Sequence, residues 1–189
     1  MAKILILGKN NSSTKILYHK LSLKHSVDVV VEDSESLKLF YRRRIKKMGV
    51  FPVLGQILFS IFSKIILKPI SINRINLIKK NANLIEDDIP FNKICFLTSI
   101  NSFESKEIIQ KSNADFIVVS GTRIISKKIL ECTDVKILNI HAGITPAYRG
   151  VHGGYWALVN EERELCGVTL HYLDVGVDTG SIIGHRLIF

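Results

Sequence analysis

Short apolar runs alternate with segments of helical character at the start of this chain. The first run, Lys3–Gly8, ends at a glycine, and Ser12-Ser13-Thr14 can cap a helix that runs to about Lys24. A β-branched run at Val27–Val31 then predicts a second strand. This order of strand, helix and strand is typical of a doubly wound, Rossmann-like α/β fold.

The same alternation continues to the last residue. The almost purely apolar run Asp115–Ser120 is typical of a central strand in a parallel sheet. The remaining patterns predict strands at Lys93–Thr98, Val135–Ile140, Gly167–Leu173 and Ser181–Phe189, and helices at Ser105–Ser112, Ser126–Glu131 and Gly153–Val159. We therefore predict one α/β domain over residues 1–189, with a mostly parallel sheet and helices on both faces. Because the chain ends on an apolar strand, we expect that it is shortened there or that a partner covers this end.

One apolar segment stands apart from this alternation. Residues 50–70 are largely apolar, but Pro52, Gly55, Lys64 and Lys68 interrupt them too often for a membrane span. Their large side chains recur at helical spacing, at Leu54, Ile57, Leu58, Ile61, Phe62 and Ile65. The spacing predicts an amphipathic helix. Packing in the core or in a homodimer is favoured over contact with a membrane surface.

Composition places the chain in the ordinary globular class, with 47% hydrophobic and 23% charged residues among 189. The three cysteines, Cys95, Cys132 and Cys166, do not have metal-ligand spacing, so no metal site is predicted. Reduced thiols fit a cytoplasmic location. The first apolar run, Ile4–Leu7, is too short for a secretory signal.

Positive charge is concentrated in one part of the chain. The formal net charge is +9, and residues 36–85 contain eleven lysines or arginines and no aspartate or glutamate. The stretch Arg42–Lys47 is the densest part. Such a patch attracts phosphate on a nucleotide, an anionic lipid or a nucleic acid, although a solvated helix face explains it equally well. DNA is not among the expected partners.

Two polar side chains follow one another at the end of a predicted strand. Asn139 and His141 lie on the same side of that strand, and Ile140 faces away. Ligands of open α/β sheets bind beyond the carboxyl ends of the strands. The loop Asp174–Gly180 reaches the same edge if the preceding strand is parallel to its neighbours. This loop carries Asp174 and Asp178, and an aspartate near a histidine is the usual arrangement for setting the protonation of an imidazole.

Four stretches of the C-terminal part together resemble the formyltransferase catalytic domain. They are Leu138–His141, Pro146–Gly150, Gly167–His171 and Val177–Gly180. That family includes glycinamide ribonucleotide transformylase, methionyl-tRNA formyltransferase and sugar N-formyltransferases, and the resemblance extends over residues 115–189. It implies an enzyme that uses 10-formyltetrahydrofolate as formyl donor. It also implies a catalytic trio of Asn139, His141 and Asp178, and folate-contacting residues Thr122, Arg123, Ile125, Val175 and Val177.

The chemistry of formyl transfer needs these residue types. An oxyanion develops when an amine attacks the formyl carbon, and Asn139 and His141 can each donate a hydrogen bond to it. Donors of this kind are each worth about 3–4 kcal/mol when removed singly. Asp178 would stabilise the imidazolium and help to relay a proton. His152 is expected either to bond Asp178 or to belong to a helix start, and His171 is assigned to its strand rather than to catalysis.

Departures from the family pattern bear on the acceptor. The loop Gly8–Ser13 differs from the phosphate loop of the glycinamide ribonucleotide enzyme, and the chain has no counterpart of the tRNA enzyme's C-terminal domain. We therefore expect a small-molecule amine as substrate, with an amino sugar linked to a nucleotide as the preferred acceptor. Glycinamide ribonucleotide and methionyl-tRNA remain alternatives, as do a non-catalytic nucleotide- or membrane-binding domain and a truncated, inactive fragment.

Overall fold

A computed structural model describes residues 1–33 and 36–188. The chain divides into two compact units. The first combines Met1–Asp33 with Glu86–Phe189, and the second is Ser34–Ile85. The two units are described separately.

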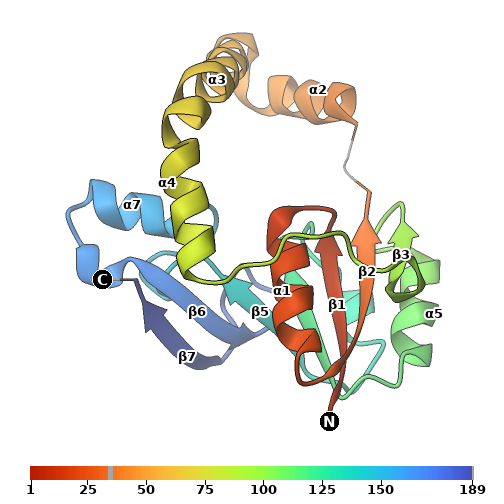
Figure 1. The fold of residues 1–189 in the computed structure, drawn as a ribbon. Helices are drawn as coiled ribbons and strands as arrows, with labels where there is room; N and C mark the ends of the chain where they lie inside the picture. Colours follow the sequence, from red (N-terminus) through yellow and green to blue (C-terminus); the bar gives the residue numbers. More distant parts are fainter. Residues whose placement is uncertain (34–35, 189) are drawn as a thin grey trace. The chain divides into compact units, whose positions relative to one another are not determined.

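The first unit is built on a seven-stranded sheet with the order β3-β2-β1-β4-β5-β6-β7 (Figure 1). The strands are β1 Lys3–Lys9, β2 Ser26–Glu32, β3 Ile94–Leu97, β4 Phe116–Ser120, β5 Ile137–His141, β6 Gly167–Tyr172 and β7 Ile182–Leu187. Strands β1 to β5 pair in parallel, whereas β6 pairs antiparallel with β5 and β7 pairs antiparallel with β6. The predicted Rossmann-like, mostly parallel α/β sheet is confirmed.

Helices cover both faces of this sheet, as the alternation in β1 requires. Ile4 and Ile6 pack with Tyr18 of α1, Ser12–Ser22, in one buried cluster. Leu5 and Leu7 point to the other face, in a cluster with residues of α5, Phe103–Lys111, and α6, Lys127–Leu130. A further helix, α7 Gly153–Val159, follows β5, and single 3-10 turns lie at Phe91–Lys93 and Arg163–Leu165.

Local capping fixes where the first helix begins. The side chain of Asn11 accepts a hydrogen bond from the backbone N–H of Thr14 at 3.0 Å and so caps α1. The cap therefore lies one residue before the serine pair expected from the sequence. The other predicted elements of this unit are found within about two residues of their expected ends, as is usual for such boundaries. Phe189, the expected end of the last strand, lies outside the described residues.

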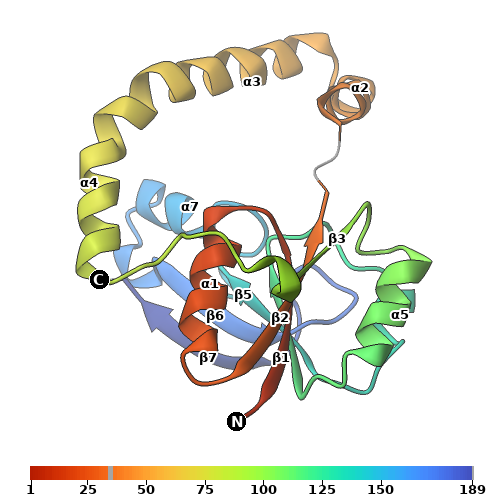
Figure 2. The ribbon, with the colours of Figure 1, turned by 45° about the vertical axis from the view of Figure 1, so that its right-hand side comes forward.

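The second unit consists of helices. They are α2 Leu37–Met48, α3 Val50–Phe62, the π-helical turn η1 Ser63–Leu67 and α4 Lys68–Asn81. The last three follow one another without a break, as Figure 2 shows. The helix from Val50 to Asn81 has 32 residues and is, by length and composition alone, able to cross a membrane.

The prediction of a helix over residues 50–70 is confirmed, but its expected packing in the core is wrong. Val53 is buried, while the exposed fractions of Phe51, Leu58 and Ile65 are 86%, 59% and 64%. The apolar side chains surround the helix instead of forming one stripe, so a single supporting element could not cover them. Whether a second copy of the chain covers them stays a prediction.

Candidate active site

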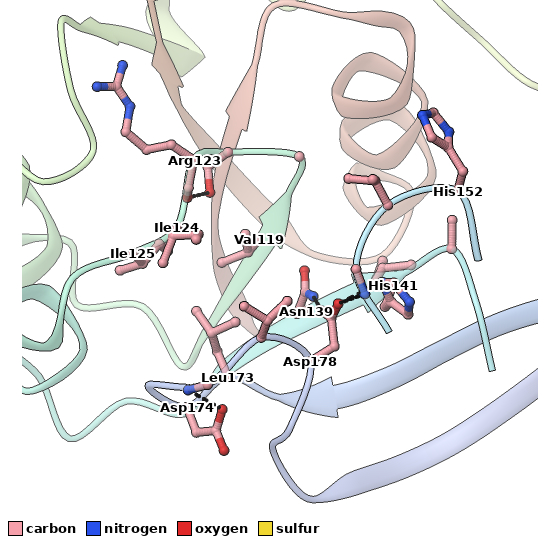
Figure 3. A pocket seen from close by; sticks show the side chains of 18 residues that line it. Val119, Arg123, Ile124, Ile125, Asn139, His141, His152, Leu173, Asp174 and Asp178 are labelled. Carbon is pink, nitrogen blue, oxygen red and sulfur yellow. Dashed lines mark hydrogen bonds and ion pairs between the residues drawn. The ribbon is translucent and has the colours of Figure 1, made fainter. Parts of the chain in front are cut away.

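A cavity of about 390 Å³ lies at the carboxyl ends of β4 and β5 in the first unit (Figure 3). Its walls come from the ends of these strands and from three loops. The lining residues are Val119, Gly121–Ile125, Asn139–Ala142, Gly150–His152, Leu173–Asp174 and Gly176–Asp178. The cavity therefore occupies the edge of the sheet where α/β folds bind their ligands.

Most of the side chains predicted for the site meet at this cavity. Asn139, His141 and Asp178 line it, and so do Thr122, Arg123, Ile125 and Val177. Val175 is not among the lining residues, and its exposed fraction is 65%. Val177, in contrast, lines the cavity although its exposed fraction is 53%.

Asp178 contacts both Asn139 and His141. The amide Nδ2 of Asn139 donates to Oδ1 of Asp178 at 3.2 Å. Nδ1 of His141 lies 3.3 Å from Oδ2 of the same carboxylate. The side chains of His141 and Asp178 are 7% and 11% exposed. A nearly buried carboxylate thus links an amide and an imidazole at one wall of the cavity.

The path by which Asp178 reaches this wall differs from the prediction. The expectation for this loop depended on a parallel strand, and β6 is instead antiparallel to β5. Strand β6 ends beside the start of β5, where Tyr172 pairs with Leu138. The loop after β6 folds back over the sheet. Oδ1 of Asp174 ties the loop together by accepting from the backbone N–H of Gly176 at 3.0 Å and from the hydroxyl of Thr179 at 2.7 Å.

Asp178 is held in place by the neighbouring loop. Its backbone has a φ of 51°, a left-handed conformation that aspartate tolerates better than most residues. The backbone N–H of Gly150 donates to Oδ2 at 2.9 Å. This N–H takes the place expected for His152, whose ring points away from Asp178 in Figure 3. His152 instead precedes α7 as its N-cap residue, which agrees with the alternative role considered for it.

His141 has a hydrogen-bond acceptor at each ring nitrogen. Nε2 lies 2.7 Å from the carbonyl oxygen of Tyr148, and Nδ1 faces Asp178. The ring can donate to both partners only when both nitrogens carry a proton. A Cβ atom at Gly143 would lie 2.7 Å from Nε2 and 2.5 Å from the Tyr148 oxygen. Glycine is therefore required where the loop passes this ring.

His171 lies beneath the site, and its contacts exceed the structural role predicted for it. The residue belongs to β6, as expected, and is 1% exposed. Nδ1 is 2.8 Å from the carbonyl oxygen of Tyr172, so a proton there leaves Nε2 free to accept from Nδ2 of Asn139 at 3.1 Å. His171 and Asp178 thus use both amide hydrogens of Asn139. The contact with Asn139 could not be predicted from the sequence, because it depends on the antiparallel register that places His171 opposite Asn139.

A buried carboxylate that sequence reasoning missed supports the opposite wall. Glu32, at the end of β2, is 2% exposed. Its Oε1 accepts from the backbone N–H of Ile100 at 2.8 Å and pairs with Nε of Arg123 at 2.5 Å. Its Oε2 accepts from the backbone N–H of Arg123 at 3.2 Å. The loop that carries Thr122, Arg123 and Ile125 is thereby fixed to the sheet.

Metal ligands are not grouped in the part of the chain that the structure describes. Within residues 1–33 and 36–188, no group of three or more histidine, cysteine, aspartate or glutamate side chains could hold a metal ion.

The family of this chain follows from a match that includes Asn139, His141 and Asp178. A family model described as formyl transferase matches residues 88–188, more than half of the chain. The chain belongs to the formyl transferase family. The match includes every cavity residue named above and excludes the helical second unit.

Individual relatives in the formyl transferase family match over part of their length. The methionyl-tRNA formyltransferase of Finegoldia magna is 40% identical over 86 residues, which are 45% of this chain and 27% of that protein. The methionyl-tRNA formyltransferase of Clostridium tetani is 40% identical over 81 residues, 42% of this chain and 26% of that protein. The match thus spans about a quarter of the length of these curated relatives.

Solved structures of formyltransferases share the fold. Glycinamide ribonucleotide transformylase 1 of Symbiobacterium toebii has a TM-score of 0.57 at 19% identity, covering 98% of this chain and 72% of that one. A sugar N-formyltransferase of a Shewanella species has a TM-score of 0.56 at 14% identity, covering 100% of this chain and 58% of that one. At these identities the likeness concerns the fold alone.

Proposed function

We propose that this protein transfers a formyl group from a 10-formyltetrahydrofolate donor to a primary amine, with Asn139, His141 and Asp178 as catalytic residues. One observation carries the proposal. The Asp178 carboxylate contacts the side chains of both Asn139 and His141 at the wall of the cavity, within the segment that matches the formyl transferase model.

The trio has the donors and the charge that this reaction requires. The amine nitrogen forms a bond to the formyl carbon, and the carbonyl oxygen takes up negative charge. His141 donates to that oxyanion from Nδ1, and Asn139 shares the amide hydrogen that otherwise bonds Asp178 at 3.2 Å. Preorganised donors stabilise such an oxyanion strongly in a site that excludes water.

Proton transfer completes the reaction without a further reagent. The bond between the formyl carbon and the donor nitrogen breaks as the oxyanion collapses. The proton lost by the attacking amine passes to the departing nitrogen, and the Asp178 carboxylate, 11% exposed, accepts and relays it. Since the amine loses one proton and the leaving nitrogen gains one, the trio ends in its starting state.

The donor would lie between two of the three loops that line the cavity. Thr122, Arg123 and Ile125 would meet one side of the pterin, and Val177 the other. Val175 enters the proposal only as part of the loop Asp174–Asp178, because its side chain faces outward. The apolar side chains offer contact to a flat ring, and the loop backbones offer hydrogen bonds to its edge.

Thermal shift with 5-formyltetrahydrofolate, a stable analogue of the donor, tests this site. A ligand that binds only the folded protein raises the melting temperature by mass action. We expect a shift that rises with ligand concentration and is lost in Val177→Asp. Val159→Asp is the matched control, because Val159 and Val177 have similar exposed fractions, 50% and 53%, and Val159 lies outside the cavity lining. Equal shifts in the two variants would contradict the proposed donor site.

For the acceptor we propose an amino sugar linked to a nucleotide. The loop Gly8–Ser13, which differs from the phosphate loop of the glycinamide ribonucleotide enzyme, supports this choice. Methionyl-tRNA is the second candidate, since the relatives at 40% identity carry that name. Mass spectrometry of each amine after incubation with donor and protein separates the two. Gain of one formyl group on methionyl-tRNA alone would overturn the first choice.

A further inference from the structure

The second unit exposes an unusual amount of apolar surface. Phe51, Phe59, Ile65 and Ile70 are 86%, 62%, 64% and 74% exposed. Only 6% of the most apolar window in the helix Val50–Asn81 is buried. Contiguous apolar surface of this kind marks a place that another phase or partner covers.

The apolar residues of α3 point in every direction around its axis. Consecutive pairs such as Phe51 with Pro52, Leu58 with Phe59 and Ile61 with Phe62 cannot lie on one stripe, because neighbours in a helix are about 100° apart. A helix that is apolar on all sides is normally surrounded by a large core or by lipid. The helices of this unit supply no such core, since Val53 is the buried residue among those they contain.

The preceding helix, α2, combines an apolar side with a basic side. At helical spacing, its apolar side holds Leu37, Phe40, Tyr41, Ile45 and Met48, and its basic side holds Lys38, Arg42, Arg43, Lys46 and Lys47. Leu39 falls on the basic side and Arg44 on the apolar side. The guanidinium of Arg44 lies over the ring of Phe40, 5.2 Å from its centre. An amphipathic helix with a basic polar face is typical of binding in the plane of a membrane interface.

Charge decides between lipid and a second copy of the chain. Residues 36–85 contain eleven cationic side chains and no aspartate or glutamate. Two copies packed through this unit would bring like charges together, which opposes association. Anionic headgroups are complementary to the same charges, and each lysine or arginine near such a surface strengthens attachment.

The distribution of lysines favours a helix in the interface over one that crosses the bilayer. Sixteen residues, Met48–Ser63, separate Lys47 from Lys64 without a charge. The helical part of this stretch, residues 50–63, extends for about 21 Å at about 1.5 Å per residue, less than the roughly 30 Å of a hydrocarbon core. Lys68, one turn beyond Lys64, adds a second charge on the same side of the helix.

We propose that residues 36–85 dock this protein on an anionic membrane surface, with α3 embedded in the interface and the basic side of α2 on the lipid headgroups. The helices α2, α3 and α4 lie outside the segment that matches the formyl transferase model, so membrane docking is a property separate from formyl transfer.

Co-sedimentation of the full chain with lipid vesicles tests this proposal. Neutral vesicles contain phosphatidylcholine alone, and anionic vesicles contain added phosphatidylglycerol. We expect binding to the anionic vesicles that is at least about tenfold tighter than to the neutral ones and that weakens as salt rises, because salt screens surface charge.

Two variants separate charge from insertion. Arg42→Glu with Lys46→Glu and Lys47→Glu should lose at least about tenfold in affinity for anionic vesicles. The matched control changes three exposed lysines of the first unit to glutamate, Lys24, Lys111 and Lys128, with the same change in net charge. Its affinity should fall less than threefold, or about 0.65 kcal/mol at most. Phe51→Gln with Phe59→Gln should also lose binding while α2 keeps its charge.

Three results would overturn the proposal. One is equal loss of binding in the charge variant and its control, which would show dependence on net charge alone. Another is a lipid-free dimer in sedimentation velocity that Phe51→Gln with Phe59→Gln dissociates, which would make a second copy the occupant. The third is a folded monomer that does not bind anionic vesicles. Each assay is done without folate, so these failures are distinct from failure of the formyl transfer proposal.

Discussion

The buried carboxylate of Glu32 leads to a prediction about both stability and the cavity wall. Glu32→Gln keeps the size of the side chain and replaces one oxygen with an NH₂ group. Three donors meet the two oxygens in the native protein: the backbone N–H groups of Ile100 and Arg123, and Nε of Arg123. The remaining oxygen of glutamine can accept from the N–H of Ile100 and from Nε of Arg123, so the partly buried backbone N–H of Arg123 loses its acceptor.

The expected cost follows from that count. A buried donor without an acceptor costs about 1–3 kcal/mol, so we expect Glu32→Gln to lower the free energy of unfolding by about 2 kcal/mol. Loss of the ion pair adds little, because the Arg123 side chain is 41% exposed and water can solvate it. For a domain of this size, about 2 kcal/mol corresponds to a fall of about 4–8 °C in melting temperature.

Urea denaturation measures this change, and a neighbouring ion pair provides the control. Asp28 lies on the same strand and pairs with Lys93 at 3.0 Å, but the two side chains are 37% and 36% exposed. Asp28→Asn should therefore cost less than about 1 kcal/mol. Affinity for 5-formyltetrahydrofolate should fall in Glu32→Gln and not in Asp28→Asn, since only Glu32 holds the loop at Arg123. Equal unfolding free energies for the two variants would refute this reasoning.

Two further predictions concern single residues. Gly143→Ala should slow formyl transfer by about 100-fold, because its Cβ would collide with the His141 ring and displace it. Gly184→Ala is the control and should leave the rate unchanged, since no atom of the described residues lies within 4 Å of its Cβ. Burial raises the pKa of the Cys132 thiol against the opposing charge of Lys106, so iodoacetamide should label it more slowly in the folded protein than in urea at neutral pH, and faster as pH rises. Mass spectrometry follows the labelling of Cys132. Equal labelling rates in the folded protein and in urea would contradict the prediction for this thiol.

The strands and the two polar residues of β5 could be predicted because the evidence for them is local. Alternation between apolar and polar positions is visible in the sequence, and it places Asn139 and His141 on one side of a strand. The direction of β6 is not visible in this way, because Gly167–Tyr172 alternates equally well in a parallel or an antiparallel pair. The approach of Asp178 and His171 to Asn139 depends on that direction.

Contacts between residues that are distant in the sequence could not be predicted from local patterns. Glu32 ends an apolar run, but its partners at Ile100 and Arg123 are 68 and 91 residues away. The helix over residues 50–70 has the spacing of a core helix, and only the surrounding structure shows that Phe51 and Ile65 are exposed.

The most direct test of the account compares two histidines that line the same cavity. His141 contacts Asp178, whereas the ring of His152 points away from it. Single-turnover formyl transfer is measured on the amine that the wild-type protein formylates fastest, with circular dichroism to establish that each variant is folded. We expect His141→Ala to lower the rate by about 100-fold or more and His152→Ala to change it by less than about threefold. A folded His141→Ala variant with a nearly normal rate would contradict the proposed mechanism.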